Sequence, residues 1–291
     1  MLNDMLMKQA TDAITLANGR LLPLSKPLVM GVINITPDSF SDGRQYLNPD
    51  TAVEHALRLE SEGADMLDLG GESSRPGAEP LSVSEELARV IPVLTKLRSR
   101  STLPISIDTY HAETARVSIE NGADIINDIT ALQGDSRMAE VVKKSKAPLV
   151  LMHMQGTPKT MQKSPFYDDV ISEIDSFFTE RIDFCVSHGI DRSKIILDPG
   201  IGFGKRLADN LAILNHLSEF RNHGLPILIG LSRKSFISKI HPTEKAADNR
   251  LGGSLAGAII AVQNGANIIR VHDVRETVQA LAFIQALWGD Q

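Results

Sequence analysis

Eight short apolar runs alternate with longer amphipathic segments from residue 28 to the end of the chain, and this alternation constrains the fold more than any other feature. The apolar runs predict strands at residues 28–34, 65–70, 104–108, 124–127, 148–153, 194–198, 226–231 and 267–271. The segments that follow them predict helices at residues 50–62, 84–99, 111–121, 136–145, 168–188, 209–222, 249–263 and 274–288. Parallel strands need a long crossover, usually a helix, so the pattern indicates repeated βα units and a parallel sheet.

Three segments resemble one another and support the same unit structure. EGADMLDLG, NGADIINDI and NGANIIRVHD, which begin at Glu62, Asn121 and Asn264, each run from a helix-ending glycine into an apolar strand. Eight units in 291 residues fit an α/β fold with a single (β/α)8 TIM barrel better than a doubly wound sheet, which usually has fewer strands. The barrel is expected to span residues 28–291, after an N-terminal leader of uncertain structure at residues 1–27.

The sequence also indicates where some helices begin and end. Thr51 with Glu54, and Ser82 with Glu85, have the spacing of a capping box, in which a hydroxyl and a carboxylate three residues later bind each other's backbone N–H groups. Gly63 can adopt the left-handed conformation that often follows the last turn of a helix. The first helix is therefore expected to end just before Gly63.

Composition and charge exclude several classes of function. The net charge of −6 and the pI near 5.8 argue against nucleic-acid binding, which normally needs a basic face. No apolar run approaches the ~20 residues of a membrane-spanning helix, and the N-terminus lacks the pattern of a signal peptide. Cys185 is the only cysteine, which excludes an internal disulfide and a zinc site built from cysteines. We expect a cytoplasmic protein without a membrane or nucleic-acid partner.

Polar side chains close most of the expected strands. If the strands form a barrel, their C-terminal ends point into one mouth, where ligands of this fold bind. The strand-end residues are Asn34, Asp108, Asn127, His153, Asp198, Ser232, Lys234, Arg270 and His272, and the loop residues Arg75 and Lys205 are also able to reach this mouth.

These side chains fall into two chemical groups. The first can exchange several hydrogen bonds with the edge of a nitrogen heterocycle and consists of Asp108, Asn127 and Asp198. The second offers cationic donors to an oxyanion and consists of Arg75, Lys234, Arg270 and His272. A ligand with a flat heterocycle at one end and a phosphate at the other satisfies both groups.

Structural roles are the alternatives for the same residues. Asp is favoured at helix N-caps, which fits Asp108, and Asp198 precedes a Pro-Gly pair that favours a turn. Lys234 follows Arg233, so the two could form an exposed charge pair. GIGFG at residues 200–204 is a weak signal for a phosphate loop, because the lysine–serine ending of such loops is missing. The histidines on the expected helices show no metal-ligand spacing.

Eight ordered motifs are similar to those of the dihydropteroate synthase family of the folate pathway. The motifs are NITPDSFSDG, GGESSRPGA, SIDTY, INDI, MHMQGTP, DPGIGFGK, GLSRKSFI and RVHDV, and they run from about Leu28 to the C-terminus. The resemblance implies that 6-hydroxymethyl-7,8-dihydropterin diphosphate condenses with p-aminobenzoate to give 7,8-dihydropteroate and diphosphate. It also implies a homodimer formed by the late helices, and sulfonamide inhibitors that occupy the p-aminobenzoate site.

The resemblance assigns roles residue by residue. The implied pterin site consists of Asp108, Asn127, Met152, Asp198, Gly202, Phe203 and Lys234. The implied diphosphate site consists of Asn34, Arg270 and His272, and Asn34 is also the expected ligand of Mg²⁺. The implied p-aminobenzoate site consists of Phe40, Ser74, Arg75, Pro76, Lys234 and Ser235. The catalytic residues implied are Asp108, Lys234, Arg270 and His272. The chain departs from the family pattern at Ser74, where many relatives have Thr, and at Arg44, where Gly is common.

An SN1-like mechanism is expected, because positive charge on the pterin methylene can delocalise into the dihydropterin ring. Asp108 would stabilise the cation, while Mg²⁺, Arg270 and His272 would stabilise the leaving diphosphate. Two alternatives remain. One is a methyltransferase of the wider pterin-binding group that passes a methyl group to a corrinoid protein, which gives no reason for the ESSRPG motif. The other is a pterin-binding paralogue without activity.

Overall fold

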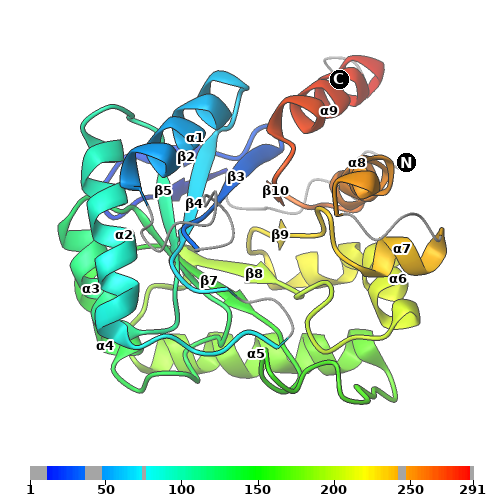
Figure 1. Ribbon diagram of the computed structural model, residues 1–291. Coiled ribbons are helices and arrows are strands. Elements are labelled where there is room, and N and C mark those ends of the chain that lie inside the picture. The colour runs from blue at the N-terminus through cyan, green and yellow to red at the C-terminus, as the bar shows by residue number, and fades with distance from the viewer. Residues whose placement is uncertain (1–11, 37–47, 74–76, 242–246, 289–291) are drawn as a thin grey trace.

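The eight predicted strands form one closed parallel barrel. The computed structural model describes residues 12–36, 48–73, 77–241 and 247–288 (Figure 1). The strand order is β8-β7-β6-β5-β4-β3-β10-β9, and a parallel bridge between Leu197 and Ile227 closes the ring. The strands are β3 (Leu28–Asn34), β4 (Met66–Gly70), β5 (Ile105–Asp108), β6 (Ile125–Asp128), β7 (Leu149–Met152), β8 (Ile195–Asp198), β9 (Leu228–Ile229) and β10 (Ile268–Val271). The prediction of a single TIM barrel is confirmed.

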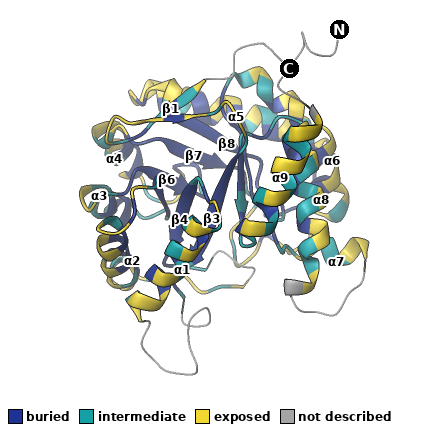
Figure 2. Cartoon of the chain, turned by 90° about the horizontal axis from the view of Figure 1, so that it is seen from above, coloured by how far each residue is buried: buried dark blue, intermediate teal, exposed yellow. Residues whose placement is uncertain are grey.

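Helices surround the barrel, and Figure 2 shows the buried strands at the centre and exposed residues on the outer faces of the helices. The α-helices are α1 (Pro49–Ser61), α2 (Val83–Arg98), α3 (Ala112–Glu120), α4 (Met138–Ser145), α5 (Val170–Ser187), α6 (Leu207–Asn215), α7 (Phe236–Ile240), α8 (Leu251–Gln263) and α9 (Val274–Trp288). The short 3₁₀ helices are η1 (Arg192–Lys194), η2 (Leu217–His223) and η3 (Ala247–Arg250). In the described part of the chain, no helix combines the length and apolar character needed to cross a bilayer.

Two helix predictions need correction. The segment predicted as one helix at residues 209–222 divides into α6 and η2, because the backbone of His216 leaves helical geometry at φ −109° and ψ 16°. Leu217 and Phe220 then bury themselves at a spacing of three residues, which suits a 3₁₀ turn. The short helix α7, which follows β9, was not predicted from the sequence.

One of the two predicted capping boxes forms. Ser82 and Glu85 cap α2 reciprocally, as the sequence indicates. The prediction for Thr51 and Glu54 is wrong, because Asn48 caps α1 through a 2.9 Å bond from the Asp50 N–H, and Pro49 occupies the first helical position, which suits its fixed φ. Gly63 has φ +100° just after α1, as expected for a residue that ends a helix.

The leader contributes a hairpin to the N-terminal end of the barrel. Strands β1 (Ala13–Thr15) and β2 (Leu21–Pro23) pair antiparallel. Ile14, Leu16 and Leu22 are buried in one cluster with the inward-facing side chains of the barrel strands, which include Leu28, Met30, Met66, Ile125, Val150, Ile196, Leu228 and Ile268. This apolar cluster fills the end of the barrel opposite the strand-end polar residues.

Candidate active site

The register of the parallel strands brings the predicted polar residues to one level at the C-terminal end of the barrel. Asn34 on β3 pairs with Gly70 on β4, Gly70 pairs with Asp108 on β5, and Asp108 pairs with Asn127 on β6. Met152 and Asp198 pair at the ends of β7 and β8. The other described site residues lie on β10 or in the loops after β8, β9 and β10 and are Arg270, Gly202, Phe203, Lys234, Ser235 and His272. Phe40, Ser74, Arg75 and Pro76 lie outside the described residues.

Arg270 connects two carboxylates across the mouth. Its Nε donates to Oδ2 of Asp68 at 2.7 Å, and its Nη2 lies 2.6 Å from the same oxygen and donates to Oδ2 of Asp108 at 2.9 Å. Asp108 therefore does not cap the following helix, whose N-cap is His111, so that alternative is wrong. The arrangement gives the mouth a fixed network of alternating charges.

Asp68 is the member of this network that sequence reasoning missed. It lies in the middle of β4, is 0% exposed, and is also within 3.4 Å of Nδ2 of Asn127 through both carboxylate oxygens. The signal was present in the strand MLDLG, because a carboxylate inside an apolar strand must have a partner that compensates for its loss of hydration.

Burial brings the pKa values of several site groups toward neutrality. The pKa of Asp108 is raised to about 7, mainly by burial, with Asp68, Glu86 and Asp128 adding to the rise and Arg270 opposing it. Burial lowers the pKa of Lys234 to about 8, against the effect of the Asp198 carboxylate. Perturbed groups of opposite sign in one concave mouth are typical of a catalytic site.

Lys234 points into the site and is not half of an exposed charge pair. Its Nζ donates a short hydrogen bond to the Ile201 carbonyl oxygen and lies 4.5 Å from the ring centroid of Phe203. Arg233 turns the other way, where its Nε donates to Asp273 at 3.0 Å. The φ of Arg233 is +59°, an unfavourable conformation that directs the two neighbouring side chains to different places.

The loop after β8 packs directly on the end of β7. A Cβ atom on Gly200 would lie 2.0 Å from the His153 carbonyl oxygen, and one on Gly204 would lie 2.3 Å from that of Gln155, so only glycine fits at either position. Asp198 accepts the Gly200 N–H at 2.7 Å through Oδ1, which confirms its turn role, and its Oδ2 has no hydrogen-bond donor in the part of the chain that the structure describes. The tight loop fixes Gly202 and Phe203 above the barrel.

The buried side chain of Lys205 links this loop to the residue that follows β7. Its Nζ lies 2.9 Å from Nδ1 of His153 and donates to the carbonyl oxygens of His153 and Phe203 at 3.2 and 3.1 Å. Burial lowers the pKa of Lys205 to about 7, and burial together with Lys205 lowers that of His153 to about 2. His153 is therefore a neutral hydrogen-bond partner in the fold, with its ring centroid 4.9 Å from that of Phe177.

His272 is positioned by Ser232. Both the backbone N–H and Nδ1 of His272 lie 3.2 Å from the hydroxyl oxygen of Ser232, which is buried. This contact joins the loops after β9 and β10 beside Arg270. The ligand roles that the resemblance implies for His272 and the other site residues stay predictions.

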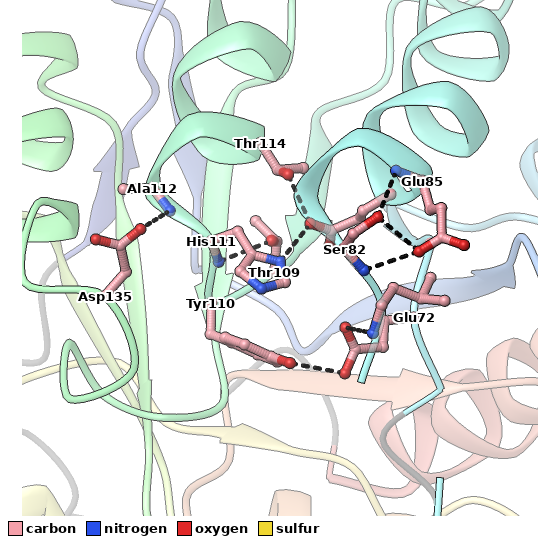
Figure 3. Close-up of polar contacts among 12 residues, drawn as sticks. Glu72, Ser82, Glu85, Thr109, Tyr110, His111, Ala112, Thr114 and Asp135 are labelled. Atoms are coloured by element: carbon pink, nitrogen blue, oxygen red, sulfur yellow. Dashed lines mark hydrogen bonds and ion pairs between the residues drawn. The ribbon is translucent and has the colours of Figure 1, made fainter. Parts of the chain in front are cut away.

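A cavity of about 430 Å³ lies beside Met152 at the same end of the barrel. At its rim, Tyr110 donates to Glu72 at 2.8 Å (Figure 3). The cavity is mainly apolar, and its walls include Ile129, Met152, Met154, Phe177, Ala78 and Pro158. Met152 is the residue that this cavity shares with the predicted pterin site, and the residues of the charged network do not line the cavity.

A second polar cluster connects α2 and α3 on the outer side of the barrel mouth. Figure 3 shows His111 and Thr114 approaching the first turn of α2. There, Nδ1 of His111 lies 2.8 Å from the Glu86 carboxylate, and the Thr114 hydroxyl donates to it at 2.6 Å. These contacts tie α3 to α2 just behind Asp108.

Comparison with known proteins identifies the family. Residues 30–272 match the family model described as pterin binding enzyme. The chain is 48% identical to the dihydropteroate synthase of Escherichia coli strain K12 over 270 residues, which cover 93% of this chain and 95% of that one. A crystal structure of the Yersinia pestis dihydropteroate synthase with a sulfonamide drug complex superposes with a TM-score of 0.89 at 47% identity, over 95% of this chain and 99% of the other.

The Xanthomonas albilineans dihydropteroate synthase in complex with 7,8-dihydropteroate is also similar, with a TM-score of 0.86 at 42% identity over 96% of this chain and 100% of the other. These matches extend across nearly the full length of both chains and include the strands that carry the mouth. The chain therefore belongs to the dihydropteroate synthases, within the family of pterin-binding enzymes.

Proposed function

We propose that this protein condenses 6-hydroxymethyl-7,8-dihydropterin diphosphate with p-aminobenzoate to give 7,8-dihydropteroate and diphosphate. The observation that carries the proposal is the network at the barrel mouth, where Arg270 pairs with the Asp108 carboxylate and Lys234 lies close enough to interact with it electrostatically. A cationic intermediate with an anionic leaving group needs both signs of charge within one site.

The ring of the pterin is recognised by hydrogen bonds and by two apolar surfaces. Asp198 and Asn127 offer acceptors to the ring N–H groups, and Lys234 donates to a ring acceptor. Met152 lies beneath the ring as part of the cavity wall, and Phe203 lies beside Lys234. Because the loop after β8 is fixed by Gly200 and Lys205, Phe203 is ordered before the substrate binds.

Arg270 and His272 bind the diphosphate. In the described part of the chain, Arg270 uses Nε and Nη2 on Asp68 and Asp108, and its Nη1 has no hydrogen-bond partner there. Nη1 is therefore the edge that Arg270 offers to a phosphate oxygen. His272 lies in the loop that follows the strand carrying Arg270, and Ser232 orients its ring.

Mg²⁺ fits the donor set at the end of β3. Among the described residues, no group of three His, Cys, Asp or Glu side chains is arranged to hold a metal. Mg²⁺ often takes only one or two protein oxygens and completes its shell with water and substrate phosphates, so the amide oxygen of Asn34 fits this mode. When bound, the ion would neutralise charge on the leaving diphosphate.

The chemistry divides into bond cleavage and bond formation. The bond between the pterin methylene and the diphosphate oxygen breaks first, and its electron pair leaves with the diphosphate. Asp108 in its ionised form stabilises the positive charge that spreads into the ring. The amine lone pair of p-aminobenzoate then forms the new C–N bond, and the amine loses a proton, so no covalent enzyme intermediate is needed.

The second substrate and the sulfonamides share a place beside Lys234 and Ser235. Structures of relatives support binding of both kinds of ligand, because one contains 4-aminobenzoic acid and another a sulfonamide drug complex. The shared place is what the family resemblance implies. The remaining predicted contacts, from Phe40, Ser74, Arg75 and Pro76, lie outside the described residues. The family resemblance is the basis for assigning those contacts.

A homodimer formed by the late helices is supported by exposed apolar side chains. Ile260 on α8 is 41% exposed, and Phe283 and Leu287 on α9 are each 66% exposed. Apolar side chains of this size, gathered on neighbouring helices, are typical of a contact surface. The location in the cytoplasm stays a prediction.

The test is the formation of dihydropteroate from the two substrates by the purified full chain, with Mg²⁺ and with a sulfonamide as the control. Turnover that the sulfonamide inhibits is expected. Methyl transfer to a corrinoid without dihydropteroate formation would support the methyltransferase instead. Pterin binding in a calorimeter without any turnover would support a binding paralogue.

A further inference from the structure

Asp68 lies at the centre of the charged network but does not close a strand or face the mouth directly. It is fully buried on β4, between Val32 of β3 and Ser106 of β5 in the strand register. A buried carboxylate costs several kcal/mol of hydration, so its presence in a barrel interior requires compensating contacts. Asp68 finds these contacts in Arg270 and Asn127.

Asp68 determines which edge of Arg270 faces the site. The guanidinium has five N–H donors, and Asp68 takes Nε together with one side of Nη2. Asp108 receives a single contact from Nη2, through one oxygen. Without Asp68, the guanidinium is free to turn and pair through two nitrogens with Asp108, which would remove Nη1 from the site and neutralise the carboxylate.

Asp68 also determines the orientation of the Asn127 amide. Both oxygens of Asp68 are acceptors, so the Asn127 group that faces them must be the NH₂, and Nδ2 lies 3.4 Å from each. The Asn127 carbonyl oxygen then remains as an acceptor for a ligand N–H. An uncharged side chain at position 68 would leave the amide without this constraint.

We infer that Asp68 is a positioning residue of the active site, which orients Arg270 and Asn127 toward the pterin diphosphate and limits the pairing of Arg270 with Asp108. The inference rests on the proposed function, because the two oriented groups are the ones proposed to bind the substrate. It assigns Asp68 no contact with the substrate.

The other end of the barrel offers a matched control that separates a positioning role of Asp68 from a purely structural one. Asp124 is also a buried aspartate, 1% exposed, that pairs with an arginine, Arg98, at 3.0 Å. It lies just before β6, where it also accepts hydrogen bonds from Asn18 and the Ile105 N–H at 2.6 and 2.9 Å. Asp124→Asn therefore removes a buried charge of the same kind away from the mouth.

The experiment compares wild type, Asp68→Asn and Asp124→Asn for binding and turnover. In Asp68→Asn we expect inorganic diphosphate to bind about tenfold more weakly, 6-hydroxymethylpterin several-fold more weakly, and kcat to fall about tenfold, because a small misorientation of binding groups is costly. In Asp124→Asn we expect lower stability, with both affinities and kcat within about twofold of wild type. Asp68→Asn values equal to those of Asp124→Asn would overturn the inference.

The pH profile gives a readout that a loss of stability would not change. Asp108 is faced by Arg270 from β10, Lys234 from the loop after β9, Asp68 from β4, Glu86 from α2 and Asp128 from β6. Removal of the Asp68 charge lowers the pKa of Asp108 directly, and a closer approach of Arg270 lowers it further. The acid limb of kcat/KM should therefore move to lower pH by about one unit in Asp68→Asn and stay in place in Asp124→Asn. An unmoved limb in Asp68→Asn would contradict the positioning role.

Two additional arms keep the test decisive. If Asp68→Asn does not fold, the double variant Asp68→Asn/Arg270→Gln removes both charges and avoids an uncompensated ion. Compared with Arg270→Gln alone, it should lose affinity for 6-hydroxymethylpterin through Asn127 but lose no further affinity for diphosphate, and equal pterin affinities would overturn the inference. If the wild type binds both probes without turnover, the proposed function fails, while the binding comparison still tests Asp68.

Discussion

At the N-terminal end of the barrel the inward-pointing side chains are apolar, whereas at the C-terminal end they are charged. The hairpin residues Ile14 and Leu22 complete a cluster without charged members at the first end. At the second end, the carboxylates of Asp68 and Asp108 share Arg270. The same eight strands therefore supply stability at one end and chemistry at the other, since buried charges contribute little to stability unless every contact is ideal.

The two buried aspartate–arginine pairs show the same difference in detail. Asp124 near the N-terminal end is surrounded by donors, and its partner Arg98 also donates to the Leu103 carbonyl oxygen at 3.0 Å. Arg270 at the mouth is shared between two carboxylates, and its Nη1 has no hydrogen-bond partner among the described residues. Donors on both oxygens of Asp124 suit a structural role, whereas retained hydrogen-bonding capacity on Arg270 suits a site that must still bind a substrate.

The largest effect on chemistry is expected for Asp108→Asn. The change removes the negative charge that stabilises the cation, and kcat should fall about 10²-fold or more, as for loss of one preorganised charge contact. The measurement is the steady-state rate of dihydropteroate formation. An unchanged kcat would remove Asp108 from this role.

The matched control for Asp108 is Asp128→Asn at the same end of the barrel. The Asp128 carboxylate is buried but accepts the backbone N–H groups of Thr130 and Leu132 at 2.8 and 2.9 Å. It therefore holds a turn and has no contact with Arg270 among the described residues. We expect lower stability, because the turn loses a charged acceptor, and less than a tenfold change in kcat, because Asp128 acts on Asp108 only through an electrostatic effect weaker than that of Asp68.

The largest effect on stability is expected at the opposite end, for Ile14→Ala. Ile14 is 0% exposed in the apolar cluster, and truncation of such a side chain lowers the free energy of unfolding by about 2–5 kcal/mol. The rate per folded molecule should stay within about twofold, because the cavity forms far from the mouth. Urea unfolding and kcat measured on the same sample test both parts. A large fall in kcat without a loss of stability would break the comparison between the two ends.

The placement of the strand ends at one mouth could be predicted because the barrel is periodic. Several strands are mainly apolar runs that end in a polar residue, as at Asp108 and Asp198, and parallel register then brings these ends together. The sequence could not assign the hairpin, because β1 and β2 have three residues each. An isolated two-stranded hairpin is marginally stable, so this one depends on its packing against the barrel. Short strands carry too few residues to show a period.

Asp68 was missed for a different physical reason. Its partners lie 202 and 59 residues away along the chain, and no local pattern reveals that Arg270 and Asn127 are beside it. The cap of α1 was misassigned because two nearby residues, Asn48 and Thr51, both suit an N-cap, and the proline at position 49 decided between them. Local chemistry thus indicated the candidates, while long-range contacts selected among them.

A smaller effect is expected for Lys205→Met, which tests whether the loop after β8 must be fixed from beneath. The variant keeps the length of the side chain but loses the bonds to the carbonyl oxygens of His153 and Phe203. The KM for the pterin substrate should rise several-fold with kcat changed less, because the loop carries binding groups and not the charged network.

The same variant has a pH signature in stability. The folded-state pKa of Lys205 is about 7, below its ordinary value of 10.5, so the folded protein binds fewer protons than the unfolded chain between these values. The stability that comes from burying the neutral amine is therefore fully present above pH 10.5 and is lost as the pH falls toward 7, because protonation favours the unfolded chain in this range. Unfolding free energies measured across this window should rise less steeply with pH in Lys205→Met, and an equal slope would contradict burial of the ammonium group.

The smallest effect is expected for Ser82→Ala. It tests whether a residue near the mouth affects catalysis when it does not contact the charged network around Arg270. Ser82 caps α2 at the mouth side of the barrel, where its hydroxyl accepts the Glu85 N–H at 3.3 Å and donates to the Glu85 carboxylate at 2.6 Å. Loss of the cap should lower the free energy of unfolding by about 1 kcal/mol. kcat, KM and the pH profile should all match the wild type, because α2 reaches the mouth through Glu86 and not through its cap. A shift of the acid limb in this variant would mean that the placement of α2 alone changes the pKa of Asp108. The contrast between the two ends of the barrel would then depend on the whole layer of helices and not on the network around Arg270.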